Sequence, residues 1–137
     1  MSIQIKDRFL CVVYASETAQ NIKQAVVEAV FEKISLAGAD LQGADLRKID
    51  LSYANLRDVN LTGANLSGTN LRGANLNFAC LLRANLTSAC LCKATLFNTD
   101  LRWAKISCAD LRGIDLRSAD LRWVKLSSAI ISENQNL

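Results

Sequence analysis

The sequence predicts a solenoid, a chain wound into stacked coils, which follows a small unit of two strands and a helix. From residue 34 to residue 131, every fifth residue is Leu or Ile, at twenty positions of which eighteen are Leu. Two residues before each of them lies a second series of small or apolar residues, which includes thirteen Ala. Residues 1–33 lack this period, so they form a separate segment.

A period of five matches neither the 3.6 residues of a helical turn nor the two residues of a simple strand. A helix would spread these leucines over its whole circumference. A coil that turns a corner every five residues places the Leu and the small residue inside and the other three outside. Alanine suits a narrow, crowded interior, and the six glycines suit corners that need permissive backbone dihedral angles.

The stretches ADLQGADLR, NLTGANLSGTNLRGANL and ADLRGIDLRSADL resemble the pentapeptide-repeat proteins, whose pattern is A(D/N)LXX. The resemblance covers residues 34–131 and implies a mainly β fold, a right-handed quadrilateral parallel β-helix with four pentapeptides in each coil. Twenty repeats then make five coils. Residues twenty positions apart, such as Trp103 and Trp123 in LRWAK and LRWVK, should lie on neighbouring coils about 4.8 Å apart.

Residues 1–33 predict a ββα unit that covers the open N-terminal end of the solenoid. Ile3 and Ile5 alternate with polar residues, and residues 9–15 suggest a second strand. From Thr18 to Lys33 the apolar residues fall on one face of a helix, with Ser16 or Thr18 as the N-cap. Those apolar residues are Ile22, Val26, Val27, Val30 and Phe31.

Two other interpretations of this segment remain open. One places the helix on a membrane surface, but the helix lacks the basic face that such binding needs, so no membrane contact is expected. Residues 9–15 also resemble the core of a short signal peptide, although Asp7 precedes them and a helix follows. The favoured location is therefore the cytoplasm.

The C-terminal tail, residues 132–137, is too short for a helical cap. The last coil, with Leu126, Ala129 and Ile131, is expected to be poorly covered. A homodimer through the C-terminal coil would cover it, and the resemblance implies that such pairing occurs in the family.

Composition argues against an enzyme. The chain has no His, the commonest general base and metal ligand. Its five Cys include no CxxC pair and no two at a spacing of twenty, so they are interpreted as reduced thiols that fill space. Cys90 and Cys92 flank Leu91 on one face, a weak indication of metal or oxidation chemistry. No catalytic, cofactor-binding or metal-binding residue, and no cofactor, is predicted.

The charges are nearly balanced. Asp immediately precedes the central Leu in seven repeats, where its carboxylate can bond the turn backbone, and five repeats read Asp-Leu-Arg. The resemblance also implies a possible function, because pentapeptide-repeat proteins that confer fluoroquinolone resistance mimic DNA. Such mimicry requires a strongly negative surface. Residues 34–131 instead carry twelve Lys and Arg against eight Asp. A DNA-mimicking binder of gyrase is therefore an alternative function and not the favoured one.

One corner departs from this balance. A spacing of twenty stacks Trp103 with Trp123, and Lys105 and Lys125 stand where the repeat usually has an acid. The result is a candidate partner surface with two exposed aromatic residues and several cations, formed by Arg83, Arg102, Trp103, Lys105, Arg122, Trp123 and Lys125. It predicts recognition of a protein, or of anions and nucleic acid by stacking and charge. The competing interpretation is an aromatic ladder that only strengthens neighbouring coils, since Tyr53 and Phe78 also point outward without basic neighbours.

The favoured function is a non-enzymatic scaffold or protein-interaction module with an unidentified protein partner. The alternatives are the gyrase binder, and a nucleic-acid or anion binder that uses the Trp, Lys and Arg residues of this corner. With a net charge of +3, nucleic acid is not the expected partner.

Overall fold

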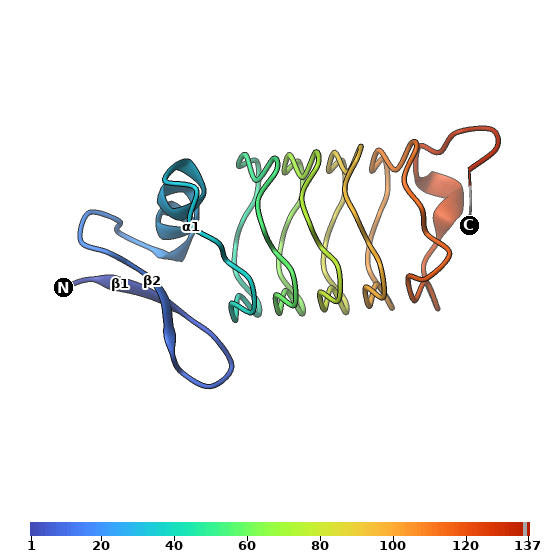
Figure 1. Cartoon of the computed structure of the whole chain (residues 1–137). Helices are drawn as coiled ribbons and strands as arrows, with labels where there is room; N and C mark the ends of the chain where they lie inside the picture. Colours follow the sequence, from blue (N-terminus) through green and yellow to red (C-terminus); the bar gives the residue numbers. More distant parts are fainter. Residues whose placement is uncertain (136) are drawn as a thin grey trace.

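The computed structural model describes residues 1–135 and 137 and shows an elongated molecule (Figure 1). Two strands, β1 (Ile3–Lys6) and β2 (Val12–Ser16), and the helix α1 (Ile22–Phe31) lie at its N-terminal end. Stacked coils follow, and a single 3-10 turn, η1 (Leu126–Ser128), lies in the last part of the chain. The predicted mainly β solenoid is the observed architecture.

The N-terminal hairpin pairs β1 with β2 antiparallel, with Ile3 opposite Ser16. The second strand begins at Val12 and not at Phe9 as the sequence indicated. The reason is local, because the Asp7 carboxylate accepts the backbone N–H groups of Phe9 (2.8 Å) and Cys11 (2.9 Å). Those donors close the loop and are not available for strand pairing.

The helix begins later than predicted, and the predicted N-caps are wrong. Asn21 is the N-cap, and its side-chain oxygen accepts the backbone N–H of Gln24 at 2.9 Å. Ser16 and Thr18 do not cap the helix, because both hydroxyls donate to the Glu28 carboxylate. These bonds tie the end of β2 to the middle of α1.

The buried face of α1 also differs from the predicted one. It consists of Ala25, Val26 and Ala29, which join the same core as the coils. Of the residues predicted to form the face, only Val26 is fully buried, while Phe31 is largely exposed. The alanines permit a close approach that larger side chains at those positions would prevent.

Residues twenty positions apart pair in parallel along the coils, from Asp40 opposite Asn60 to Asp110 opposite Ile130. On each face a backbone N–H donates to the next coil and another donates to the preceding one. At the bridge between Asp40 and Asn60, for example, Leu41 N–H bonds to the Asn60 carbonyl (2.8 Å), and Asn60 N–H bonds to the Ala39 carbonyl (2.9 Å). Each face contributes a single bridged residue between two turns, so no long strand develops.

The corners from Gly38 to Gly113, and the one at Trp123, are type II turns, whereas the last corner is the 3-10 turn η1. The carbonyl of the central Leu accepts the N–H three residues later, as Leu36 does from Ala39 at 3.0 Å. The third residue of the turn has positive φ, which glycine adopts without strain, as at Gly63 (φ 65°). The side chain of the Asp or Asn before the Leu accepts the backbone N–H two residues later, as Asn55 does from Arg57 at 3.2 Å. These side chains therefore stabilise the turns, as the sequence predicted.

The core is a column of inward-pointing leucines, with Ile106 in the same series, that is buried from Leu36 through Leu116. In the second inward series, two residues before the leucines, Thr69 and Thr99 stand where most repeats have alanine. Each hydroxyl donates to a backbone carbonyl of an earlier coil, at 2.6 and 2.8 Å. In the last coil Leu126 is only half-buried and Ile131 is 41% exposed. Burial thus declines toward the C-terminus, as the sequence predicted.

The tail nevertheless covers part of that end, which the sequence did not indicate. The side-chain amide of Gln135 donates to the backbone carbonyls of Leu111 and Ile114, the latter at 3.2 Å. Its side-chain oxygen accepts the N–H of Ser132 at 2.9 Å, which folds the tail back.

Candidate protein-binding corner

Two tryptophans form an exposed stack over neighbouring coils near the C-terminus. The ring centroids of Trp103 and Trp123 are 5.3 Å apart and the planes differ by 17°. The side chains remain 52% and 70% exposed. The predicted stacking of residues twenty positions apart is confirmed here by direct ring contact.

The backbone explains why these rings project outward. Both tryptophans occupy the positive-φ position of their turns, with φ of 63° and 66°. A bulky residue in this region is strained by roughly 1–3 kcal/mol. Six other turns use glycine at the equivalent position. The coil therefore tolerates strain at Trp103 and Trp123 that glycine would avoid.

Two lysines complete this surface. Lys105 and Lys125 line one groove of about 330 Å³ together with the two tryptophans, and Thr87, Ser107 and Ser128 contribute hydroxyl groups. Within the described part of the chain, neither lysine has a carboxylate within 4.0 Å. Both ammonium groups therefore keep their donors and charge for a ligand.

The arginines of the predicted surface are placed differently. Arg102 makes two short bonds to Asp100 (2.9 and 2.7 Å), and Arg122 bonds Asp120 (2.9 and 2.6 Å). The hydrogen bond from Arg122 is the main cause that lowers the pKa of Asp120 to about 2. These pairs neutralise the arginines.

Arg83 lies on the preceding coil, where its N–H bonds to the Arg102 carbonyl at 2.9 Å, and it does not line the groove. Of the seven predicted residues, the structure thus brings four together around the groove: Trp103, Lys105, Trp123 and Lys125. Their role in binding a partner stays a prediction.

Outward aromatic residues elsewhere do have basic neighbours, contrary to the sequence-based expectation. The Arg57 guanidinium lies 4.4 Å from the Phe78 ring centroid, a cation–π contact. Phe97 packs edge-on against the same ring at 5.5 Å. Phe78 is thus contacted on two sides, and it also lines a pocket with Asp7, Arg8 and Phe9.

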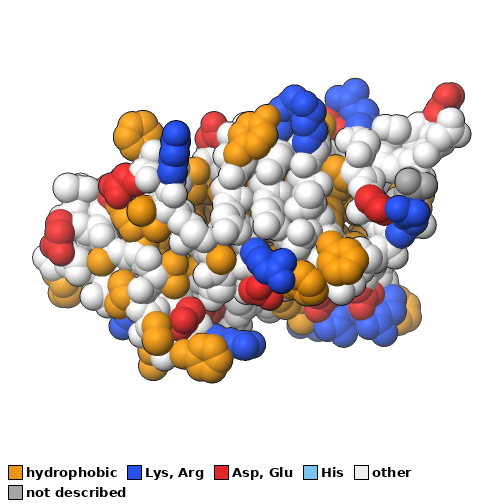
Figure 2. All heavy atoms as spheres, viewed as in Figure 1, with side chains coloured by type: hydrophobic (Ala, Val, Ile, Leu, Met, Phe, Trp, Pro, Cys, Tyr) orange, Lys and Arg blue, Asp and Glu red, His pale blue; other side chains and the backbone are white. Residues whose placement is uncertain are grey.

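Charges of both signs are interspersed over the face seen in Figure 2. Five Asp-Leu-Arg repeats form ion pairs of 2.6–2.7 Å within the repeat. This is the near-neutral surface that the sequence predicted. Within the described residues, no helix combines the length and apolar character needed to cross a membrane.

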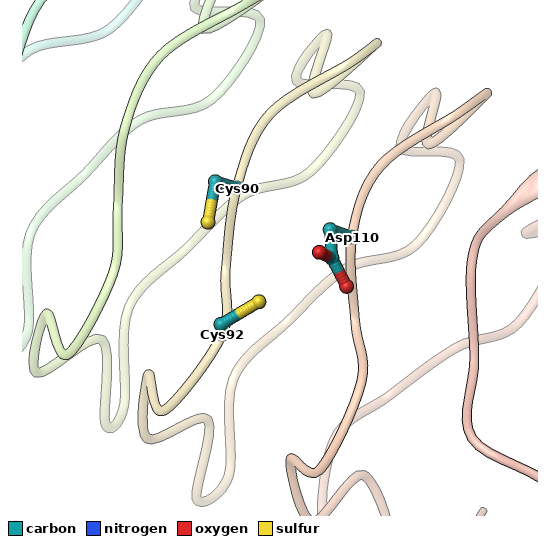
Figure 3. A group of neighbouring side chains, drawn as sticks. All are labelled: Cys90, Cys92 and Asp110. Carbon is teal, nitrogen blue, oxygen red and sulfur yellow. The ribbon is translucent and has the colours of Figure 1, made fainter.

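A second polar cluster lies on another face (Figure 3). One ligand-type atom from each of Cys90, Cys92 and Asp110 lies within 4.8 Å of the other two, and all three residues are half-buried. Burial is the largest cause that raises the pKa of Cys92 to about 11, followed by its hydrogen bond to Asp110. The Arg112 side chain is the main cause that lowers the pKa of Asp110.

Sequence reasoning singled out the two cysteines and missed the carboxylate. The signal was available, because Asp110 is twenty residues from Cys90. Cysteine-to-cysteine spacings alone do not reveal this pairing, because the third group is a carboxylate.

The comparisons with known proteins agree with this architecture. The family described as pentapeptide repeats matches residues 26–52, 54–91 and 94–132, in eight copies. No curated protein sequence matches the chain.

Solved structures extend the agreement. The chain resembles HetL of the cyanobacterium Nostoc sp. PCC 7120, a pentapeptide repeat protein involved in heterocyst differentiation regulation. The identity is 33% over 72% of this chain, with a TM-score of 0.57, and the match spans only about half (51%) of HetL. The pentapeptide repeat protein alr5209 of the same organism is 29% identical over 79% of this chain and 94% of its own, also with a TM-score of 0.57.

Rfr23 of Cyanothece 51142, at 21% identity over 85% of this chain and 99% of its own, shares the fold with a TM-score of 0.51. The family match covers well over half of the residues, and the stacked coils carry its repeat. The chain belongs to the pentapeptide-repeat family.

Proposed function

We propose that this protein is a non-enzymatic interaction module that binds a protein partner at the Trp–Lys corner formed by Trp103, Lys105, Trp123 and Lys125. One observation carries the proposal: a stacked, exposed tryptophan pair and two lysines without acidic partners border the same groove. Tryptophan is among the residues that contribute most to protein interfaces. A matching partner segment presents an apolar side chain to the rings and carboxylates to the two ammonium groups.

Nucleic acid fits this corner less well. The two rings already stack on one another, so a base has access only to their outer faces. The neighbouring arginines are held by Asp100 and Asp120, which leaves two free lysines at the groove. Strong nucleic-acid binding usually rests on more phosphate contacts than two.

A DNA-mimicking gyrase binder is the alternative function. It would need a strongly negative surface to replace the phosphate backbone. Residues 34–131 carry twelve Lys and Arg against eight Asp, and five of those acids are paired with arginine within their own repeat. These charges favour the interaction module.

We further propose that the chain is organised as five coils, residues 34–131, beneath an N-terminal cap. Parallel bridges at a spacing of twenty support the coils. The Asp40 N–H donates to the Lys6 carbonyl at 2.7 Å, and Asp7 bridges to Ala39, so the first coil is joined to the hairpin. In this arrangement the helix covers the first leucines, which would otherwise be exposed at the open end of the solenoid.

The function is tested by affinity capture from native lysate with quantitative mass spectrometry. The wild type is compared with two double variants, Trp103→Ser/Trp123→Ser and Lys105→Glu/Lys125→Glu. We expect both variants to lose the same proteins. The loss caused by the lysine substitutions should be larger at low salt than at high salt, because salt screens exposed charges.

The matched control is Lys48→Glu/Lys93→Glu, which changes the net charge equally at two other turns. It should retain every partner. If the control loses the same proteins, non-specific charge explains the binding and the proposal is wrong. If partner capture survives both corner variants, the tryptophans are only a structural ladder.

A further inference from the structure

We propose that Cys90, Cys92 and Asp110 form a binding site for a thiophilic divalent metal ion such as Zn²⁺. The proposal is independent of the Trp–Lys corner. It rests on how the coils place two thiols and a carboxylate on one face (Figure 3).

The backbone fixes the relative positions of the three groups. Leu91 is fully buried, so its two neighbours both point outward on the same face. Cys90 bridges in parallel to Asp110 on the next coil. Two hydrogen bonds hold that bridge, from Leu91 N–H to the Asp110 carbonyl (2.9 Å) and from Asp110 N–H to the Ala89 carbonyl (2.9 Å). The ligands are therefore carried by a rigid part of the solenoid.

The separations suit coordination. The two sulfur atoms and a carboxylate oxygen lie within 4.8 Å of one another. Two metal–sulfur bonds of about 2.3 Å at the tetrahedral angle place the sulfur atoms about 3.8 Å apart, so side-chain rotations that draw the two thiolates together bring both onto one ion. Asp110 then supplies a third ligand, and water fills the fourth position of a tetrahedral site.

The surrounding charges are also compatible. Two thiolates and one carboxylate carry three negative charges, so a divalent ion leaves one in excess. Arg112 donates to both oxygens of Asp110 at 2.9 and 2.7 Å. Hydrogen-bond partners of this kind orient metal ligands in many proteins. The Arg112 side chain is largely exposed, so solvent weakens the ion pair that competes with the metal for Asp110.

The ligand types select the class of metal. Thiolates prefer soft or borderline ions, whereas Ca²⁺ and Mg²⁺ require oxygen ligands. Binding releases the two thiol protons to solvent, forms two metal–sulfur bonds and involves no change in oxidation state.

The test uses the full-length chain, reduced with a phosphine, and two probes, Zn²⁺ and Cd²⁺. Calorimetry against a competing chelator should give one Zn²⁺ per chain. Cd²⁺ should produce the ultraviolet charge-transfer absorption of a cadmium–thiolate bond. Cys90→Ser and Cys92→Ser should each weaken Zn²⁺ binding by at least about 100-fold, more than the about 10–100-fold lost when an outer partner is removed. Asp110→Asn should weaken it by about tenfold or more.

Cys80→Ser is the matched control, because Cys80 precedes a core leucine on a different face just as Cys90 does. It should leave the Zn²⁺ affinity unchanged. A measurement without variants guards against misfolding: Zn²⁺ should protect Cys90 and Cys92 from alkylation, located by mass spectrometry, and leave Cys80 and Cys108 as reactive as before. Absence of a stoichiometric complex, unchanged affinity in either serine variant at Cys90 or Cys92, or equal protection of all cysteines would overturn the proposal.

Discussion

Tyr53 on one coil covers Gly73 on the next so closely that a Cβ atom at Gly73 would lie 2.4 Å from two ring carbons. Gly73 also has a φ of 66°, which disfavours any other residue. Two separate effects therefore disfavour a larger residue at position 73, namely backbone strain and steric overlap with the side chain of a neighbouring coil.

The first prediction separates these costs. Gly73→Ala should lower the free energy of unfolding by more than Gly63→Ala, because Gly63 has the same backbone (φ 65°) but open space around its Cβ position. Strain alone accounts for about 1–2 kcal/mol at each position. Urea denaturation measures both values.

Tyr53→Ala provides the control. In its background, Gly73→Ala should cost no more than Gly63→Ala, because the ring that causes the overlap is gone. Equal costs of the two glycine substitutions in the wild-type background would contradict the steric account.

The second prediction concerns the tryptophan stack. A double-mutant cycle with Trp103→Ser and Trp123→Ser should give a coupling energy of about 0.5–1.5 kcal/mol, as expected for stacked aromatic rings. These are the only two tryptophans in the chain, so their fluorescence reports this corner alone. Strictly additive effects on the unfolding free energy would mean that the rings are not in contact in solution.

The third prediction concerns acid stability. The side-chain hydrogen bonds from Arg117 and Arg122 are the main cause that lowers the pKa values of Asp115 and Asp120 to about 2. An unfolded Asp titrates near 3.9, so the unfolded chain binds more protons between these values. The stability from these pairs is present above about pH 4 and is lost as the pH falls toward about 2.

Thermal unfolding followed between pH 5 and pH 2 measures this loss. Arg117→Gln with Arg122→Gln should flatten the decline, because it removes the donors that hold the carboxylates ionised. An unchanged pH dependence in that variant would assign the acid sensitivity to other groups. The effect should be modest, since these pairs are largely exposed.

The fourth prediction concerns the exposed end of the solenoid. We propose that two copies pair through the last coil, where Leu126 is half-buried and Ile131 is exposed. Sedimentation should show a monomer–dimer equilibrium, and Ile131→Glu should shift it to the monomer. Phe31→Glu changes an exposed apolar side chain at the opposite end and should leave it unaltered. A monomer at all concentrations would refute the pairing.

Much of the fold follows from the sequence because the repeat is a physical constraint. A leucine every fifth residue has one inward arrangement, and its register places Trp103 against Trp123 without further information. The N-terminal segment was harder to predict, because several side chains there could serve as a cap. Ser16 and Thr18 have the right chemistry, but Glu28 engages both hydroxyls, and Asn21 takes the role.

The candidate site was predicted in outline and corrected in detail. The sequence places Arg102 and Lys105 on the same corner but does not show which cation is free. Arg102 reaches Asp100 in its own repeat, whereas Lys105 occupies the position before the core residue that Asp100 has in the preceding repeat. The contact of Gln135 with the last carbonyls depends on how the tail folds back, and no repeat pattern encodes it.

The uniform spacing between paired residues has a consequence for folding kinetics. Each new coil closes a loop of the same length, so each step carries a similar entropic penalty and no step requires a distant part of the chain. The hairpin offers the first coil a surface to form on, since the Asp40 N–H bonds directly to the Lys6 carbonyl. We therefore expect the coils to form one after another from the N-terminal end, each on the coil before it, and the C-terminal coil to unfold first.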